Sequence, residues 1–276
     1  MSLKIGDVSK LLNMTVETLR FYESENIIKP TRKVDSKYRV YETWDVFYLM
    51  ECLKYRSFDI SVRDISKILY AEDLNFFLKK LEEKQKKVSD TIRYNTMLAE
   101  KIEKYKSRLE TVEFNEGNFW FENIPEQNYV VYVESNGDQY DDINKANSLL
   151  SELLKFLPFV EFGEHISAAD LLSRNEVNHN TWSLLIENKY LNLLNLPFND
   201  LVVTLPSHLA LCTIVNAGEK GELSYKLLDP ALEYLNKNNF VINGDITGKL
   251  LLRTHQDKQF CRYFEMQIPV KKDLSL

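Results

Sequence analysis

Basic side chains gather between residues 29 and 39, and phosphate binding is the chemistry that such a cluster supports. A single acid, Asp35, lies among them. The basic members are Lys29, Arg32, Lys33, Lys37 and Arg39. The whole chain has a net charge of −6, and residues 115–276 hold 13 Lys and Arg against 22 Asp and Glu. Focused charge, rather than net charge, therefore points to a nucleic-acid site in the N-terminal part.

Catalytic and metal-binding patterns are missing from the sequence. The four histidines are scattered without metal-ligand spacing, and the three cysteines Cys52, Cys212 and Cys261 form no Cys-x-x-Cys pair. No hydrolase, zinc-protease, dinucleotide or P-loop motif occurs. We therefore expect no catalytic residue, no metal and no cofactor, and we interpret the cysteines as buried thiols.

Short helices must position the basic segment. Residues 5–12 carry apolar side chains at helical spacing, residues 13 and 14 interrupt the pattern, and Thr15 can cap a second helix over 16–22. Two helices joined by a tight turn form a helix-turn-helix. Turn-forming residues between β-favouring ends over 29–41 predict a hairpin, the wing of such a module. Further helices are expected over 45–56 and from Ser61, with Asp64 completing its cap, to about Tyr70.

Five segments in register resemble MerR-type transcriptional regulators. They are residues 5–9, 17–23, 28–30, 38–41 and 61–65. The resemblance covers about the first 110 residues and implies two partners, double-stranded promoter DNA and RNA polymerase at the promoter, with bending of the promoter spacer as the mechanism. Asp59 stands where the family usually has glycine, and aspartate tolerates the left-handed backbone conformation better than most residues.

Recognition-helix and wing residues are assigned to DNA on the basis of this resemblance. Val16, Leu19 and Phe21 are expected to hold the helix to the core instead. The DNA-binding residues that we assign are Thr15, Thr18, Arg20, Tyr22, Lys37, Tyr38, Arg39 and Arg56.

Residues 74–115 are expected to form one long helix. No Pro or Gly occurs from 74 to 114, and apolar positions alternate spacings of four and three, as in a coiled coil. About forty residues at 1.5 Å each give roughly 60 Å, longer than a small domain is wide, so the seam needs a partner helix. The resemblance implies an antiparallel homodimer. The residues assigned to dimerisation are Leu81, Val88, Ile92, Ala99 and Ile102.

Strands and helices alternate from residue 118 onward. Strands are expected at 119–122, 127–134, 165–172 and 181–187, with a helix over 141–156. A second β-β-α-β-β copy follows, with strands at 205–214, 241–253 and 260–270 and a helix over 221–237. This arrangement resembles the GyrI-like effector-binding domain. We therefore expect an α+β chain of three parts: a winged helix-turn-helix domain (1–73), a coiled-coil dimerisation helix (74–115) and an effector-binding domain (118–272).

Aromatic side chains are expected to line an effector cleft between the two halves. In the branch that responds to lipophilic cations, a carboxylate lies in the pocket on the strand before the last, where this chain has Gly248. Glu187 and Glu265 could substitute for it, and Arg262 could instead pair with an anionic compound. The effector-binding residues that we assign are Tyr132, Tyr140, Trp182, Glu187, Tyr225, Tyr263 and Glu265.

Three functions remain open from the sequence. The first is a transcription regulator that responds to a small lipophilic or aromatic effector, as in multidrug-responsive regulators. The second is a DNA-binding regulator whose C-terminal domain binds no ligand, and the third is a hydrolase, because some free-standing GyrI-like domains resemble hydrolases. No stretch is apolar enough for a membrane helix and no signal-peptide pattern is present, so a cytoplasmic protein without membrane contact is expected.

Overall fold

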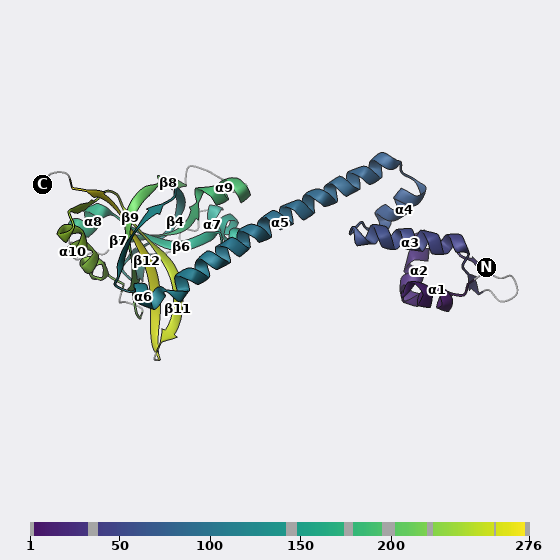
Figure 1. Ribbon diagram of the computed structural model, residues 1–276, viewed down its shortest axis with the longest axis horizontal. Coiled ribbons are helices and arrows are strands. Elements are labelled where there is room, and N and C mark those ends of the chain that lie inside the picture. The colour runs from purple at the N-terminus through teal and green to yellow at the C-terminus, as the bar shows by residue number, and fades with distance from the viewer. Residues whose placement is uncertain are drawn as a thin grey trace. The chain divides into compact units, whose positions relative to one another are not determined.

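The chain folds into two compact units, Met1–Thr96 and Met97–Leu276. The computed structural model describes residues 3–32, 38–141, 148–173, 179–194, 202–219, 223–256 and 258–273. Helix α5 (Leu74–Glu110) contributes residues to both units. The first unit is mainly helical and the second is built on an antiparallel sheet, so the expected α+β class is confirmed (Figure 1). Within these residues no helix is long and apolar enough to cross a membrane.

The first unit is a helix-turn-helix with a two-stranded wing, as predicted. Asn13 ends the first helix with a left-handed backbone, and Thr15 accepts a hydrogen bond from the backbone N–H of Thr18 at the start of the second. The wing strands pair antiparallel. The elements are α1 (Ile5–Leu12), α2 (Val16–Ser24), β1 (Thr31–Arg32), β2 (Arg39–Val40), α3 (Thr43–Ser57) and α4 (Val62–Tyr70).

Buried aliphatic side chains hold these elements together. Leu19 of α2, Leu49 of α3 and Ile65 of α4 are completely buried in one cluster. Asp59, between α3 and α4, adopts a φ of +59°, the left-handed conformation expected of it. Its carboxylate also lies 2.6 Å from Nζ of Lys84 on α5. Aspartate at this position therefore makes an ion pair that glycine could not make.

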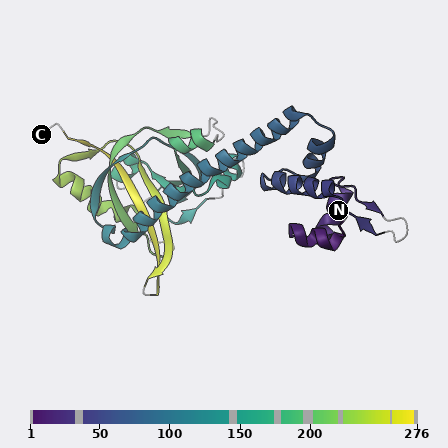
Figure 2. The same ribbon diagram turned by 45° about the vertical axis from the view of Figure 1, so that its right-hand side comes forward.

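The second unit is a curved sheet made of two similar halves. One half comprises β4, α7, β6 and β7, and the other comprises β9, α10, β11 and β12. The strand order is β3-β9-β12-β11-β6-β7-β4-β5, with β8 on β4 and β10 on β12. Each half thus receives at its edge the strand that precedes the other half, which agrees with the predicted repeat. The β11–β12 hairpin extends beyond the rest of the sheet (Figure 2).

The helices and strands of the second unit have the following bounds, in chain order. They are α6 (Val112–Asn115), β3 (Phe119–Ile124), β4 (Gln127–Asn136), β5 (Gln139–Tyr140), α7 (Ser148–Leu153), the 3-10 turn η1 (Leu154–Phe156), β6 (Val160–Ile166), α8 (Ala168–Ser173), β7 (His179–Glu187), α9 (Asn188–Leu194), β8 (Val203–Leu205), β9 (His208–Asn216), the 3-10 turn η2 (Tyr225–Leu228), α10 (Asp229–Lys237), β10 (Phe240–Ile242), β11 (Ile246–Gln256) and β12 (Gln259–Lys272).

The strand expected at 165–172 is wrong, because the strand lies earlier and a helix follows it. β6 covers Val160–Ile166, and α8 starts at Ala168. The hydroxyl of Ser167 accepts a hydrogen bond from the backbone N–H of Asp170, and the carboxylate of Asp245 accepts one from the N–H of Ala168. These side chains satisfy the free N–H groups of a helix start, which ends the strand.

The two halves meet where β6 pairs with β11. Gly163 lies opposite Lys249, and Glu164 lies opposite Gly248. A β-carbon on Gly163 would come within 2.0 Å of Cδ1 of Leu185 and 2.8 Å of the carbonyl oxygen of Gly248. The close approach of the strands therefore requires glycine at position 163.

We predict that Gly163→Ala destabilises the protein by about 1–3 kcal/mol or more, because the added methyl group meets a fixed backbone oxygen. Gly244→Ala is the matched control, since its β-carbon would lie at ordinary contact distance, 3.5 Å from Pro269. Urea denaturation followed by far-ultraviolet circular dichroism measures both variants. Equal midpoints for Gly163→Ala and Gly244→Ala would contradict the packing described here.

Candidate DNA interface and effector site

The recognition helix α2 presents a polar surface. Thr15 and Arg20 are exposed, and Thr18 is half-buried with its hydroxyl 2.8 Å from that of Thr15. In helix-turn-helix proteins the exposed side of the second helix contacts base edges in the major groove. Three of the residues assigned to DNA are thus placed where contact is possible.

Tyr22 and Phe21 exchange the roles that the sequence suggested. Tyr22 is 6% exposed and belongs to the core of the first unit, so we withdraw it from the DNA interface. Burial raises the pKa of its hydroxyl. Phe21 is 48% exposed and does not hold the helix to the core. The spacing of Val16, Leu19 and Tyr22 by three residues was the signal that could have distinguished the two aromatic residues.

The wing is joined to the recognition helix by an ion pair. Nε of Arg39 lies 2.6 Å from Oε2 of Glu23, at the end of α2. Arg39 therefore positions the wing, and its assignment to DNA stays a prediction. Tyr38 is strongly exposed, whereas Lys37 lies outside the described residues. Arg56 is exposed and donates one hydrogen bond to the carbonyl of Ile60, which leaves it further donors.

The long helix exposes most of its predicted seam. Val88, Ile92, Ala99 and Ile102 are exposed. Leu81 differs, because it is half-buried and packs against the core of the first unit. Burying an exposed Val or Ile side chain is favourable by about 1.5–3 kcal/mol of free energy. Leaving this row of aliphatic side chains exposed to water is therefore unfavourable.

The sheet of the second unit has two different faces. Helix α10 packs on one face over Phe264 and Met266, and we call this the helix-side face. The C-terminal part of α5 covers the other face, where Glu265 lies, and we call this the α5-side face. Because successive residues of a strand point to opposite faces, each central strand contributes to both.

The helix-side face contains the larger cavity, with a volume of about 330 Å³. The ring centroids of Tyr140 and Trp182 are 5.8 Å apart at this cavity. Its lining consists of Tyr132, Val133, Tyr140, Asp141, Phe162, Trp182, Leu250 and Arg253. Three predicted effector residues, Tyr132, Tyr140 and Trp182, are thus brought together. The size and aromatic lining are typical of small-molecule sites.

A smaller recess of about 10 Å³ lies on the same face and contains a buried carboxylate. Glu164 and the predicted residue Tyr225 both line it. Glu164 is completely buried, and burial raises its pKa to about 7. It accepts a hydrogen bond of 3.1 Å from Nδ2 of Asn180. Sequence reasoning missed Glu164 because it placed the strand after this residue.

Gly248 lacks a carboxylate, but Glu164 supplies one at the same point of the sheet. A β-carbon on Gly248 would lie 2.8 Å from Cγ of Glu164 and 2.8 Å from Sδ of Met266. The space that a side chain at 248 would need is therefore occupied by the acid from the neighbouring strand.

Arg262 is fully engaged within the protein and is not available to an anionic effector. Its Nη1 and Nη2 atoms each lie 2.7 Å from a carboxylate oxygen of Asp138. It also donates to the carbonyl groups of Ala217, Gly218 and Glu219. This bidentate pair fixes the β4–β5 turn next to the cavity.

The predicted effector residues Glu187, Tyr263 and Glu265 face α5 instead of the aromatic cavity, so we withdraw them from the effector site. Tyr263 packs in a buried cluster with Val112 and Ile214. Glu187 and Glu265 lie at ion pairs beneath α5. The strand alternation was not resolved by the sequence, because the alternating positions on these strands are buried on both faces.

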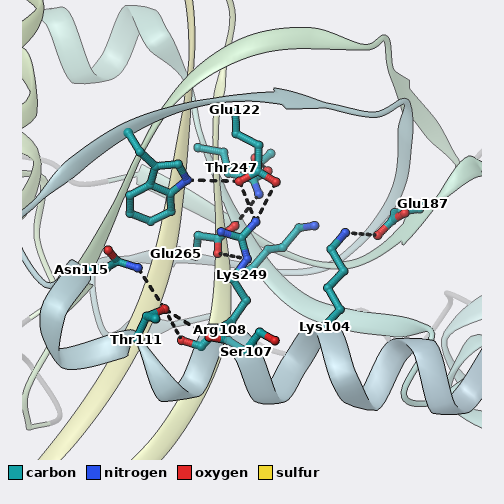
Figure 3. Close-up of polar contacts among 12 residues, drawn as sticks. Lys104, Ser107, Arg108, Thr111, Asn115, Glu122, Glu187, Thr247, Lys249 and Glu265 are labelled. Carbon is teal, nitrogen blue, oxygen red and sulfur yellow. Dashed lines mark hydrogen bonds and ion pairs between the residues drawn. The ribbon is translucent and has the colours of Figure 1, made fainter.

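Four carboxylates on the α5-side face bind three basic residues of α5. Figure 3 shows the contacts of Arg108 and Lys104 with three of these carboxylates, Glu122, Glu187 and Glu265. Arg108 Nη2 lies 2.7 and 2.6 Å from the two oxygens of Glu122, and Arg108 Nε lies 3.3 Å from Glu265. Lys104 lies 3.4 Å from Glu187. The remaining pairs are Lys101 with Glu161 at 2.8 Å, Lys249 with Glu161 at 3.4 Å and Lys189 with Glu187 at 2.8 Å. We call these residues the α5 ion-pair network.

The network keeps Glu187 and Glu122 ionised despite their burial. Burial alone would raise the pKa of Glu187, but the hydrogen bond from Lys189 and the charge of Lys104 lower it to about 2. Burial of Glu122 is likewise outweighed by Arg108, so its pKa is lowered. Removing one partner of such a pair leaves a partly buried charge, which is costly.

Comparisons with known proteins agree with this geometry in the first unit. Residues 4–41 match the family described as MerR family regulatory protein. The HTH-type transcriptional regulator ZntR homolog of Haemophilus influenzae is 34% identical over 71 residues, which cover 26% of this chain and 53% of that protein. The chain thus spans about half the length of the curated relative it matches.

Two solved structures show low similarity to this chain. The EcmrR–DNA complex in EcmrR-RPo is 12% identical, with 98% of this chain and 100% of that chain covered and a TM-score of 0.36. A hydrolase from Listeria innocua is 10% identical, with 59% of this chain and 98% of that chain covered and a TM-score of 0.35.

A helix-turn-helix with an exposed recognition helix and an attached wing defines a DNA-binding module. The match over residues 4–41 identifies this module as a MerR family N-terminal domain, as the resemblance predicted.

We predict that Phe21→Ala weakens specific DNA binding by up to about 1.5–3 kcal/mol, the gain from burying a large apolar side chain, because an exposed aromatic group on the recognition helix can contact thymine methyl groups. Its salt dependence should stay unchanged, since no charge is lost. Phe47→Ala on α3, where the side chain is equally exposed at 49%, is the matched control. Fluorescence anisotropy at several salt concentrations measures both, and equal affinities of the two variants would contradict the assignment.

A second prediction concerns pH. Since burial raises the pKa of Glu164 from 4.5 to about 7, the folded protein favours its protonated form. The free energy of unfolding should therefore fall as the pH rises from about 4.5 to about 7, by up to roughly 3 kcal/mol from this group. Glu164→Gln should remove that fall, so the variant gains stability relative to wild type between pH 5 and pH 8. Urea denaturation at each pH tests this.

Glu233→Gln on α10 is the control for that experiment, because Glu233 is exposed. Its difference from wild type should not change with pH. A difference between Glu164→Gln and wild type that is constant from pH 5 to pH 8 would show that Glu164 titrates normally.

Proposed function

We propose that the chain is a transcriptional regulator that binds promoter DNA as a homodimer and responds to a small aromatic effector. The observation that carries the first part is the exposed recognition helix with Thr15, Thr18 and Arg20, held beside a wing by the Arg39–Glu23 pair. Phosphate contacts from the wing would fix the position of α2 in the major groove. RNA polymerase at the same promoter is the partner through which DNA bending acts.

The exposed seam of α5 supports the dimer. Val88, Ile92 and Ile102 expose aliphatic surface in heptad spacing, and a second copy of the same helix offers the complementary surface. A two-fold dimer would present two recognition helices and therefore read a pseudo-palindromic sequence.

The aromatic cavity on the helix-side face supports the effector site. Tyr132, Tyr140 and Trp182 form a concave surface of the size that small ligands occupy. Binding there would gain from burial of aromatic surface. We assign Phe162, Leu250 and Arg253 to the same site because they complete its lining.

The α5 ion-pair network offers a route from effector to DNA-binding unit. On β11, Gly248 faces the helix side and its neighbour Lys249 faces α5. On β12, Met266 likewise faces the helix side and its neighbour Glu265 faces α5. A shift of these strands on effector binding would therefore change the distances to Lys101 and Arg108. Because α5 is continuous from Leu74 to Glu110, such a change would reach residues of the first unit.

A hydrolase is the second candidate function, and one observation favours it. A buried carboxyl group with a pKa near 7, such as Glu164, is suited to general acid–base catalysis. The lining of the aromatic cavity contains no Ser, Cys or Lys that could serve as a nucleophile. Recovery of unchanged ligand after prolonged incubation with the protein would exclude turnover.

Selection of bound duplexes from a randomised pool by the full-length protein tests the regulator function. We expect enrichment of one pseudo-palindrome, and loss of enrichment in Arg20→Ala, whose side chain is exposed on α2. A thermal-shift screen of small molecules then tests the effector site, because a ligand that binds only the folded state raises the melting temperature. A failure to enrich any sequence would contradict the proposal.

We predict that Ile92→Asp shifts the protein toward monomer, because it places a charge in the apolar seam. Lys86→Asp is the control, since Lys86 is exposed and lies outside the predicted seam. Sedimentation velocity at micromolar concentration distinguishes the two. A dimer that persists in Ile92→Asp would show that α5 does not carry the association.

A further inference from the structure

Two donor groups at the aromatic cavity are already bound within the protein. The indole N–H of Trp182 donates a hydrogen bond of 3.0 Å to the hydroxyl of Ser135. The hydroxyl of Tyr140 donates one of 2.9 Å to the carboxylate of Asp138. These two aromatic residues therefore offer a ligand their ring surface rather than a hydrogen-bond donor.

Tyr132 and Arg253 are the remaining side-chain donors among the described residues that line the cavity. Neither side chain has an ion pair or a hydrogen bond to another described residue. Burial raises the pKa of the Tyr132 hydroxyl, and the charge of Arg253 opposes that rise, so the two groups lie close enough to interact. Neighbouring donors of this kind are suited to an oxygen acceptor on a ligand.

A bulge on β11 turns Arg253 toward the cavity. The register with β12 shifts between Leu250 and Leu252. Residues three apart on a regular strand point to opposite faces, yet Leu250 and Arg253 both line the cavity. Bulges re-aim side chains in this way. The extra residue thus gives the cavity a guanidinium group that a regular strand would direct toward α5.

The positive charge of Arg253 has no compensation across the hairpin. Its cross-strand neighbour is Arg262, and like charges opposite each other in a sheet are unfavourable. Asp138 binds both terminal nitrogens of Arg262 and so compensates that side chain instead. Asp141, the one acid in the described lining, is exposed and forms no ion pair with Arg253. An anionic group beside Arg253 would supply the compensation.

The cavity has an apolar interior and a charged mouth. Trp182 is only 4% exposed, whereas Arg253 is exposed to solvent. The volume of about 330 Å³ is near the lower end of the range of about 300–1,000 Å³ for ligand pockets, so it suits a small aromatic compound. A charged group at the mouth keeps part of its water, which limits the desolvation cost of the ion pair.

We propose that the effector is an aromatic anion whose ring packs against Trp182 and Tyr140 and whose carboxylate binds Arg253 and Tyr132 at the mouth of the cavity. This inference rests on the proposed function of the cavity as the effector site. It assigns to Arg253 the role that the sequence suggested for Arg262.

The test uses three compounds with one ring system and a similar shape: 1-naphthylacetate, 1-naphthylacetamide and 2-(1-naphthyl)ethylamine. Isothermal titration calorimetry measures their binding to the full-length protein. We expect the carboxylate to bind at least about fivefold more tightly than the amide and at least about tenfold more tightly than the amine, because only the carboxylate can form a charge-assisted bidentate pair with a guanidinium.

Three variants separate the two donors from a general effect of charge. In Arg253→Gln the carboxylate and the amide should bind with affinities within about twofold of each other. Tyr132→Phe removes only a hydroxyl and should weaken both oxygen acceptors by about twofold to fivefold, with the amine unchanged. Lys271→Gln, which removes an exposed positive charge outside the described lining of the cavity, should keep the wild-type ranking.

Two results in wild type would overturn the anion inference. They are an amide that binds as tightly as the carboxylate, and an amine that binds more tightly, which would show that an acid anchors the effector. Phe162→Ala tests the cavity itself, because Phe162 lines it and is 39% exposed, and this variant should weaken all three compounds. Unchanged affinities in Phe162→Ala would overturn the effector site. Absence of binding by all three compounds would overturn the anion inference, and the thermal-shift screen then decides on the effector site separately.

Discussion

Ion pairs between α5 and the second unit are the interaction on which the arrangement depends. Arg108 binds Glu122 in a bidentate manner and also reaches Glu265, while Lys104 pairs with Glu187. These contacts join one helix to carboxylates from separate strands, so they hold the helix on that face of the sheet. Burial makes each pair sensitive to small displacements, because a charge that loses its partner there pays a desolvation cost that an exposed pair would not.

The opposite face of the same strands carries the aromatic cavity and Glu164. Strand alternation places Lys249 toward α5 and Gly248 toward Glu164, one residue apart. Because Gly248 has no side chain, the side chain of Glu164 can occupy the space beside it. Gly163, which also has no side chain, allows β6 and β11 to approach closely. A ligand that moves Glu164 would thus act on strands that hold the ion pairs of α5. In the proposed function, effector response and helix position would in this way both depend on one sheet.

Local features were predictable from the sequence, and features fixed by distant strands were not. The turn at Asn13 and the cap at Thr15 depend on neighbouring residues, so the helix-turn-helix and its wing were predicted correctly. Adjacent Phe21 and Tyr22 were assigned the wrong way round, because both fit a helical period and only packing separates them. The burial of Glu164 depends on a glycine some eighty residues later, which no local pattern reveals.

The coupling between effector and DNA is measured most directly as a ratio of affinities. The Kd of an effector found by thermal shift is determined for the full-length protein with and without the selected duplex, in wild type and in Arg108→Gln. The account predicts that DNA changes the effector Kd by at least about fivefold in wild type. In Arg108→Gln the ratio should approach one, while the Kd without DNA changes by less than about threefold. A ratio that is the same in Arg108→Gln as in wild type would contradict the role of the α5 ion-pair network.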